Sequence, residues 1–177
     1  CNESGYYSSF FSDRYGFNNP DNIWDENDIE YLLIGDSFVL GSCVNKPNDF
    51  ASILRNITNK NVLNLGLGGA GPLIEYAALK EYYFGKVKYI LWFYYEGNDL
   101  VNLKSELSNN ILKNYLDDDK FSQNLKDKTI IIDKLHNKTL AENLKSNSNP
   151  NKFDLLFKII RLYHLRQIIK PPLENTV

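Results

Sequence analysis

Three short apolar runs, each ended by glycine and polar residues, constrain the fold of this chain more than any other feature. They span residues 29–34, 61–65 and 87–93, and segments with helical spacing stand between them at 49–54 and 72–84. Strands that alternate with helices are typical of βαβ units, whose strands lie parallel in one sheet. All three runs are apolar throughout, so we expect helices to cover both faces of that sheet. The sequence therefore predicts an α/β fold.

The chain changes in texture on either side of this strand-rich part. Residues 1–28 mix Gly, Ser, Asn, Pro and aromatic residues without a period, which indicates an irregular leader. Beyond residue 100 glycine is scarce and the apolar spacing is helical, at about 100–116, 120–145 and 152–169. We interpret residues 29–99 as the N-terminal part of a sheet domain and residues 100–177 as a helical insertion or lid of the same domain.

The composition excludes several functional classes. Lys and Arg number 20 against 22 Asp and Glu, so the chain lacks the basic excess of a nucleic-acid platform. The longest mainly apolar stretch, residues 89–95, is far shorter than the ~20 residues that span a bilayer. Two cysteines, Cys1 and Cys43, are too few for a disulfide scaffold, and two histidines exclude a His-rich metal site. We expect no cofactor.

The first apolar run ends in Gly35-Asp36-Ser37. A serine directly after a strand is exposed at the rim of the sheet, where its hydroxyl is available as a nucleophile and its backbone N–H can face an oxyanion. The alternative is structural, because serine is also a common residue at the start of a helix. Three residues alone do not decide between these interpretations.

The second run ends in a glycine-rich loop, residues 66–71. By count it matches the G-x-G-x-x-G fingerprint of dinucleotide-binding proteins. It is also suited to bring one backbone N–H close to a reacting acyl group, or to form a tight turn that needs positive φ. The loop by itself leaves all three interpretations open.

The third run ends in Glu96-Gly97-Asn98-Asp99. The Asn98 amide can donate to a developing oxyanion, although Gly-Asn-Asp is also common in turns. Glu96 alternatively fits the acidic residue that holds a ribose in dinucleotide sites. The dinucleotide interpretation leaves Gly35-Asp36-Ser37 unexplained and places the fingerprint after the second strand, whereas a serine hydrolase uses all three loops.

Taken together, these loops resemble the first three conserved blocks of the SGNH (GDSL) hydrolase superfamily. The blocks are Gly35-Asp36-Ser37, Asn64 with Gly69 five positions on, and Gly97-Asn98-Asp99, and their order at successive strand ends matches as well. Residues 12–20 also resemble the leader of some bacterial members. No G-x-S-x-G motif is present, so the chain does not resemble an α/β-hydrolase.

This resemblance implies a three-layer α/β/α, flavodoxin-like parallel sheet and hydrolysis or transfer of small acyl esters. Ser37 would be the nucleophile, and the Gly69 N–H and the Asn98 amide would be the oxyanion donors. The ligand would be a small-molecule or carbohydrate acyl ester. Alternatives are an acyltransferase of the same fold that acts on a saccharide hydroxyl, and a dinucleotide-binding module that uses residues 66–71.

The resemblance also implies a catalytic His preceded three residues earlier by Asp. The literal match is Asp133-Lys134-Leu135-His136, and residues 129–132 would be a short strand that delivers it to the rim. The surrounding helical spacing instead favours an ordinary surface pair of Asp133 and His136. His164 has no Asp three residues before it. We therefore expect an incomplete domain, with its base beyond Val177 and with export or tethering through sequence before Cys1 left open.

Overall fold

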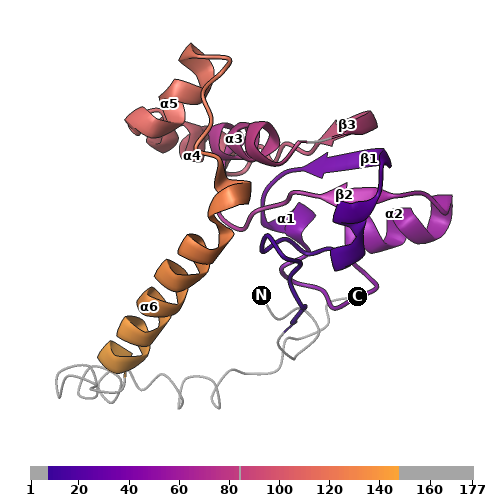
Figure 1. The fold of residues 1–177 in the computed structure, drawn as a ribbon, viewed down its shortest axis with the longest axis horizontal. Helices are drawn as coiled ribbons and strands as arrows, with labels where there is room; N and C mark the ends of the chain where they lie inside the picture. Colours follow the sequence, from indigo (N-terminus) through magenta and orange to yellow (C-terminus); the bar gives the residue numbers. More distant parts are fainter. Residues whose placement is uncertain (1–7, 84, 148–177) are drawn as a thin grey trace, which may run out of the picture. The chain divides into compact units, whose positions relative to one another are not determined.

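The computed structural model describes residues 8–83 and 85–147 and divides into two units at Thr129 (Figure 1). The first unit contains the sheet, and the second is described by the helix α6 alone. The described elements are η1 (Asp21–Asp25), β1 (Asp28–Ile34), α1 (Ser37–Leu40), α2 (Phe50–Thr58), β2 (Val62–Asn64), α3 (Pro72–Tyr82), β3 (Lys86–Trp92), α4 (Asp99–Glu106), α5 (Asn110–Asp117), η2 (Leu125–Lys128) and α6 (Thr129–Asn147).

The three predicted strands form one parallel sheet in the order β2-β1-β3. Leu33 of β1 stands in register with Asn64 of β2 and with Leu91 of β3. In the sheet, β2 lies next to one edge of β1 and β3 lies next to its other edge. The direction in which strands are added therefore reverses at β1. The α/β class and the parallel arrangement are confirmed.

Helices pack against both faces of β1. Successive side chains of a strand point to opposite faces of the sheet, so each face of β1 has its own set of contacts. Leu33 packs in one cluster with Ala51 of α2. Leu32 packs in the other cluster with Tyr82 of α3. All four side chains are buried, so α2 and α3 lie on opposite faces of β1.

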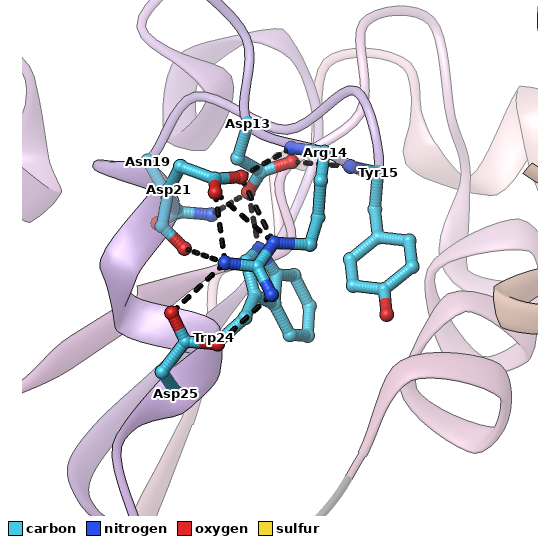
Figure 2. Close-up of polar contacts among 7 residues, drawn as sticks. All are labelled: Asp13, Arg14, Tyr15, Asn19, Asp21, Trp24 and Asp25. Carbon is cyan, nitrogen blue, oxygen red and sulfur yellow. Dashed lines mark hydrogen bonds and ion pairs between the residues drawn. The ribbon is translucent and has the colours of Figure 1, made fainter.

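The described part of the leader is irregular up to η1, as expected, but some of its side chains belong to the core. Its aromatic side chains Phe17 and Trp24 are buried in the same cluster as Leu32. The buried carboxylate of Asp13 holds the leader's shape, since it accepts hydrogen bonds from two backbone N–H groups, from Asn19 and from the Trp24 indole (Figure 2).

The third strand departs from the expectation of full burial. Tyr89, Ile90 and Trp92 of β3 are each 47% exposed, whereas Leu32 and Leu33 of β1 are fully buried. Among the described residues β3 pairs with β1 alone and forms an edge of the sheet. Within the described residues, the prediction that helices cover every strand is therefore wrong for β3. Its sequence is apolar, but its large side chains stay about half exposed.

The region after β3 is helical, as expected, but with different boundaries. The predicted helix 100–116 is interrupted, because Asn109 accepts hydrogen bonds from the N–H groups of Ile111 and Leu112 and so starts α5. The predicted helix start near 120 is wrong: the Glu81 carboxylate accepts hydrogen bonds from the N–H groups of Gln123 and Leu125, only the short 3-10 helix η2 follows, and α6 begins at Thr129.

The end of the described chain settles one alternative. Residues 129–132 belong to α6, so the proposed short strand before Asp133 is wrong and the helical interpretation is confirmed. The predicted helix at 152–169 lies outside the described residues. Among the helices of the described ranges, none combines the length and the apolar character needed to cross a membrane.

Candidate functional site

The segments that follow the three strands meet at one edge of the sheet. The Gly35 carbonyl, just past β1, accepts a hydrogen bond of 3.0 Å from the N–H of Leu67. The Ile34 carbonyl accepts one of 2.8 Å from the N–H of Phe93. The chain leaving β2 and the chain leaving β3 are thus both bonded to the end of β1, the carboxyl edge where open α/β sheets bind ligands.

The first loop presents Ser37 without using its side chain. Asp36 is the N-cap of α1, and its carboxylate accepts the Phe38 N–H at 2.9 Å. The alternative in which Ser37 caps the helix is therefore wrong. Gly35 is required here, because a Cβ at this position would lie 2.4 Å from Cγ2 of Val39. Ser37 itself is partly exposed.

The second loop is held against the first by Asn64. This side chain is fully buried; its amide donates to the Val39 carbonyl at 2.7 Å and its oxygen accepts the Gly66 N–H at 2.8 Å. A Cβ on Gly66 would come within 2.4 Å of the Leu40 nitrogen, so only glycine allows this approach. Asn64 therefore positions the loop and does not face a ligand.

Gly69 lies at the exposed tip of the same loop. Its φ is +76°, and the Ala70 N–H bonds back to Leu67, which is the pattern of a turn that needs positive φ at its third residue. A Cβ on Gly69 would meet nothing within 4 Å, so open space adjoins its backbone. The tight-turn interpretation is confirmed, and it leaves the Gly69 N–H with no acceptor among the described residues.

The third loop is held by Asp99 rather than by Asn98. The fully buried Asp99 carboxylate accepts the Tyr95 N–H at 2.6 Å. Asn98 begins α4 but makes no side-chain capping bond, and its buried Oδ1 accepts no hydrogen bond within the described residues. The backbone does form the expected turn, but that turn does not use the Asn98 amide.

Side-chain contacts connect the three loops to one another. The rings of Phe38 and Tyr95 lie 5.1 Å apart, which joins the first loop to the third. Asn102 of α4 bonds to the Ala70 carbonyl at 3.4 Å, which joins the third to the second. The loops carrying Ser37, Gly69 and Asn98 therefore form one continuous surface.

A carboxylate occupies the position that a dinucleotide phosphate would need. In dinucleotide sites the phosphate lies at the N-terminus of the helix after the glycine loop. Here Glu106 receives the N–H groups of Gly71 and Leu73 at 2.7 and 3.0 Å. An anion placed there would meet a like charge and filled donors. Nothing in the local sequence of α4 marked Glu106 for this role.

Glu75 is a further ionisable residue near this edge that the sequence did not reveal. It is fully buried in α3, and its Oε1 has no partner among the described residues. Burial, together with the nearby charges of Asp99, Asp36 and Glu106, raises the pKa of Glu75 to about 7, although the Trp92 hydrogen bond opposes this shift. A buried carboxyl group with a raised pKa thus lies in α3, the helix that follows the Gly69 loop.

No histidine belongs to the sheet unit, since His136 and His164 both follow Thr129 in the sequence. Asp133 and His136 are exposed residues of α6, three positions apart. His164 lies outside the described residues. The described ranges also contain no cluster of three or more His, Cys, Asp or Glu arranged to hold a metal ion. Cys43 is disulfide-bonded, so it does not offer a free thiol as a nucleophile in addition to the Ser37 hydroxyl.

Comparison with known proteins adds no relative: no family model matches the chain, and neither curated proteins nor solved structures give a significant match.

Proposed function

We propose that this chain carries the nucleophile and oxyanion donors of an SGNH-type serine esterase. The observed strand order β2-β1-β3 is that of the first three strands of flavodoxin-like folds, which bind ligands where the strand order reverses. Ser37 follows β1 and Asn98 follows β3, so they stand on the two sides of that reversal.

One observation carries the proposal. At both strand ends an aspartate side chain makes the bond that shapes the loop. Asp36 caps α1 beside Ser37, and Asp99 accepts the Tyr95 N–H beside Asn98, so neither loop uses the Ser37 hydroxyl or the Asn98 amide for this purpose. Structural roles alone would not need the hydroxyl and the amide. A nucleophile and an oxyanion donor account for both.

In the proposed reaction Ser37 Oγ attacks the ester carbonyl carbon as its proton passes to a histidine base, which the sheet unit does not itself contain. The carbonyl oxygen becomes an oxyanion that accepts hydrogen bonds from the Gly69 N–H, the Asn98 amide and the Ser37 N–H. Collapse expels the alcohol, which takes up the proton, and leaves an acyl-Ser37 ester. Water then hydrolyses this ester and regenerates the hydroxyl.

The test is to incubate the chain with p-nitrophenyl acetate and locate the acetyl group by peptide mass spectrometry. Because the sheet unit contains no histidine base, we expect slow acetylation of the Ser37 peptide, which Ser37→Ala abolishes and Ser105→Ala, an exposed position of α4, retains. Equal acetyl incorporation in Ser37→Ala would contradict the proposal. If the acetyl group appears on an added saccharide, the chain is a transferase, and if only free acetate forms, it is a hydrolase. Saturable binding of NAD would support the dinucleotide-binding alternative.

A further inference from the structure

An apolar cavity adjoins Ser37 on the side formed by the 38–53 segment. Its volume is about 360 Å³, and Ser37 is part of its lining. Ligand pockets in proteins have volumes of about 300–1,000 Å³, so this cavity is large enough for a small acyl group. It is bounded by the chain after Ser37 and by the first turn of α2.

Four of the ten lining residues are large apolar side chains that folding has not buried. Phe38 is 56% exposed, Phe50 47%, Ile53 43% and Val44 36%. Such side chains gathered around one hollow are typical of a binding site, because each leaves apolar area in contact with water until a ligand covers it.

The charged group at this cavity is already satisfied. Asp49 is 1% exposed, and its two carboxylate oxygens accept hydrogen bonds from the N–H and the hydroxyl of Ser52, as the N-cap of α2. The Asp49 carboxylate is therefore not available to bind a cationic ligand here, and Ser37, Ser42 and Asn48 are the other polar side chains of the lining. An apolar ligand would lose nothing by entering.

Two aromatic side chains of the cavity lining pack against the chain that leaves β3. The Phe50 ring lies 5.4 Å from the Phe93 ring, and the Phe38 ring lies 5.1 Å from that of Tyr95, so both walls rest on the chain that leaves β3. The leader is bonded to the loop that carries Val44, since the Ser9 N–H donates to the Asn45 side chain at 2.9 Å. The cavity is thus formed before any ligand binds.

We propose that this cavity binds the acyl chain of the substrate, and that the chain is an unbranched aliphatic one longer than acetyl. The inference rests on the proposed role of Ser37, because Ser37 lines the same cavity as the apolar side chains of Phe50 and Ile53. Each methylene that enters the cavity should then raise the rate of Ser37 acylation by about fourfold.

Two measurements test this, and the first does not depend on catalysis. In the Ser37→Ala variant, binding of octanoate is followed by isothermal titration calorimetry. We expect Ile53→Asn to weaken binding about tenfold, and Ile57→Asn, one turn further along α2 and outside the lining, to leave it unchanged. Val44→Asn, in the loop, gives a second lining variant, and circular dichroism confirms that each variant is folded.

The second measurement compares Ser37 acylation by p-nitrophenyl hexanoate and acetate. We expect the hexanoate preference to disappear in Ile53→Asn and to survive in Ile57→Asn. Octanoate binding that Ile53→Asn and Val44→Asn do not weaken, or equal acylation rates for both esters, would overturn the acyl pocket while leaving the esterase proposal intact. Octanoate binding without any Ser37 acylation would instead overturn the esterase proposal and retain the pocket.

Discussion

The indole N–H of Trp92 in β3 donates a hydrogen bond of 2.6 Å to the Glu75 carboxylate of α3. This is the one hydrogen bond that the Glu75 side chain accepts within the described residues, and the charged groups that influence it, Asp99, Asp36 and Glu106, are all acidic. A fully buried carboxylate with one donor and three acidic neighbours is poorly stabilised as an anion. Glu75 therefore holds a proton that an exposed glutamate would lose.

Stability should consequently fall as the pH rises. The pKa of Glu75 is about 7 in the folded chain and near its ordinary value of 4.5 when unfolded. Between these values the folded state binds more protons, so up to about 3 kcal/mol of stability is lost as the pH rises from 4.5 through 7. Urea unfolding at pH 5 and pH 8 should show that Glu75→Gln flattens this dependence and Glu96→Gln does not. If the free energy of unfolding of Glu75→Gln changed with pH as much as that of the unsubstituted chain, Glu75 would not be the group with the raised pKa.

Asp13 should be essential for docking of the leader. Asp13→Ala removes the four hydrogen bonds that this carboxylate accepts, including those from the buried Trp24 and Asn19 side chains, and should cost about 3 kcal/mol or more. The matched control is Asp25→Ala, which removes an exposed carboxylate paired with Arg14 and should cost less than about 1 kcal/mol. Chemical denaturation measures both; similar losses for the two variants would show that Asp13 is not special.

Asn98→Ala should slow acylation of Ser37 by about 10²–10³-fold, the usual cost of losing one oxyanion donor. The fold should survive, because Asp99 and not Asn98 holds the turn. Time-resolved acetylation of the Ser37 peptide measures the rate, and Asn110→Ala, exposed at the start of α5, serves as the control. An unaltered rate in Asn98→Ala would mean that the amide has no part in the reaction.

His136→Ala should leave the rate of Ser37 acylation within about twofold. Asp133 and His136 are exposed on α6, where a pair three residues apart is an ordinary surface interaction. The same acetylation assay checks this, with Lys138→Ala as a control on the same helix. A loss comparable to that of Ser37→Ala would instead make Asp133 and His136 the missing part of the catalytic triad.

The exposed edge at β3 should make the chain associate. Unpaired, apolar edge strands are templates for pairing with another chain. We expect a concentration-dependent increase in mass by light scattering, which Ile90→Lys on β3 reduces and Ile57→Lys on α2 does not, although Ile57 is the more exposed of the two at 77%. A strict monomer over the millimolar range would show that the edge is protected.

The features that the sequence could predict are those set by neighbouring residues. Apolar runs with glycine ends predicted all three strands, because a buried strand needs uninterrupted apolar side chains. The helical spacing at 49–54 and 72–84 predicted α2 and α3, since the period of apolar residues is set within a few turns, although α2 continues to Thr58. The order of the three polar loops along the chain also came from local pattern alone.

Tertiary structure alone decided which polar residues are available. Glu106 fills the start of α3 from 35 positions away. Burial raises the pKa of Glu75, and the exposure of β3 contradicts its apolar sequence. Each of these depends on contacts between segments distant in the chain, whereas Asp36 and Asp99 accept hydrogen bonds from residues close to them in the sequence. Burial and charge are properties of the whole fold, so no local window of sequence contains them.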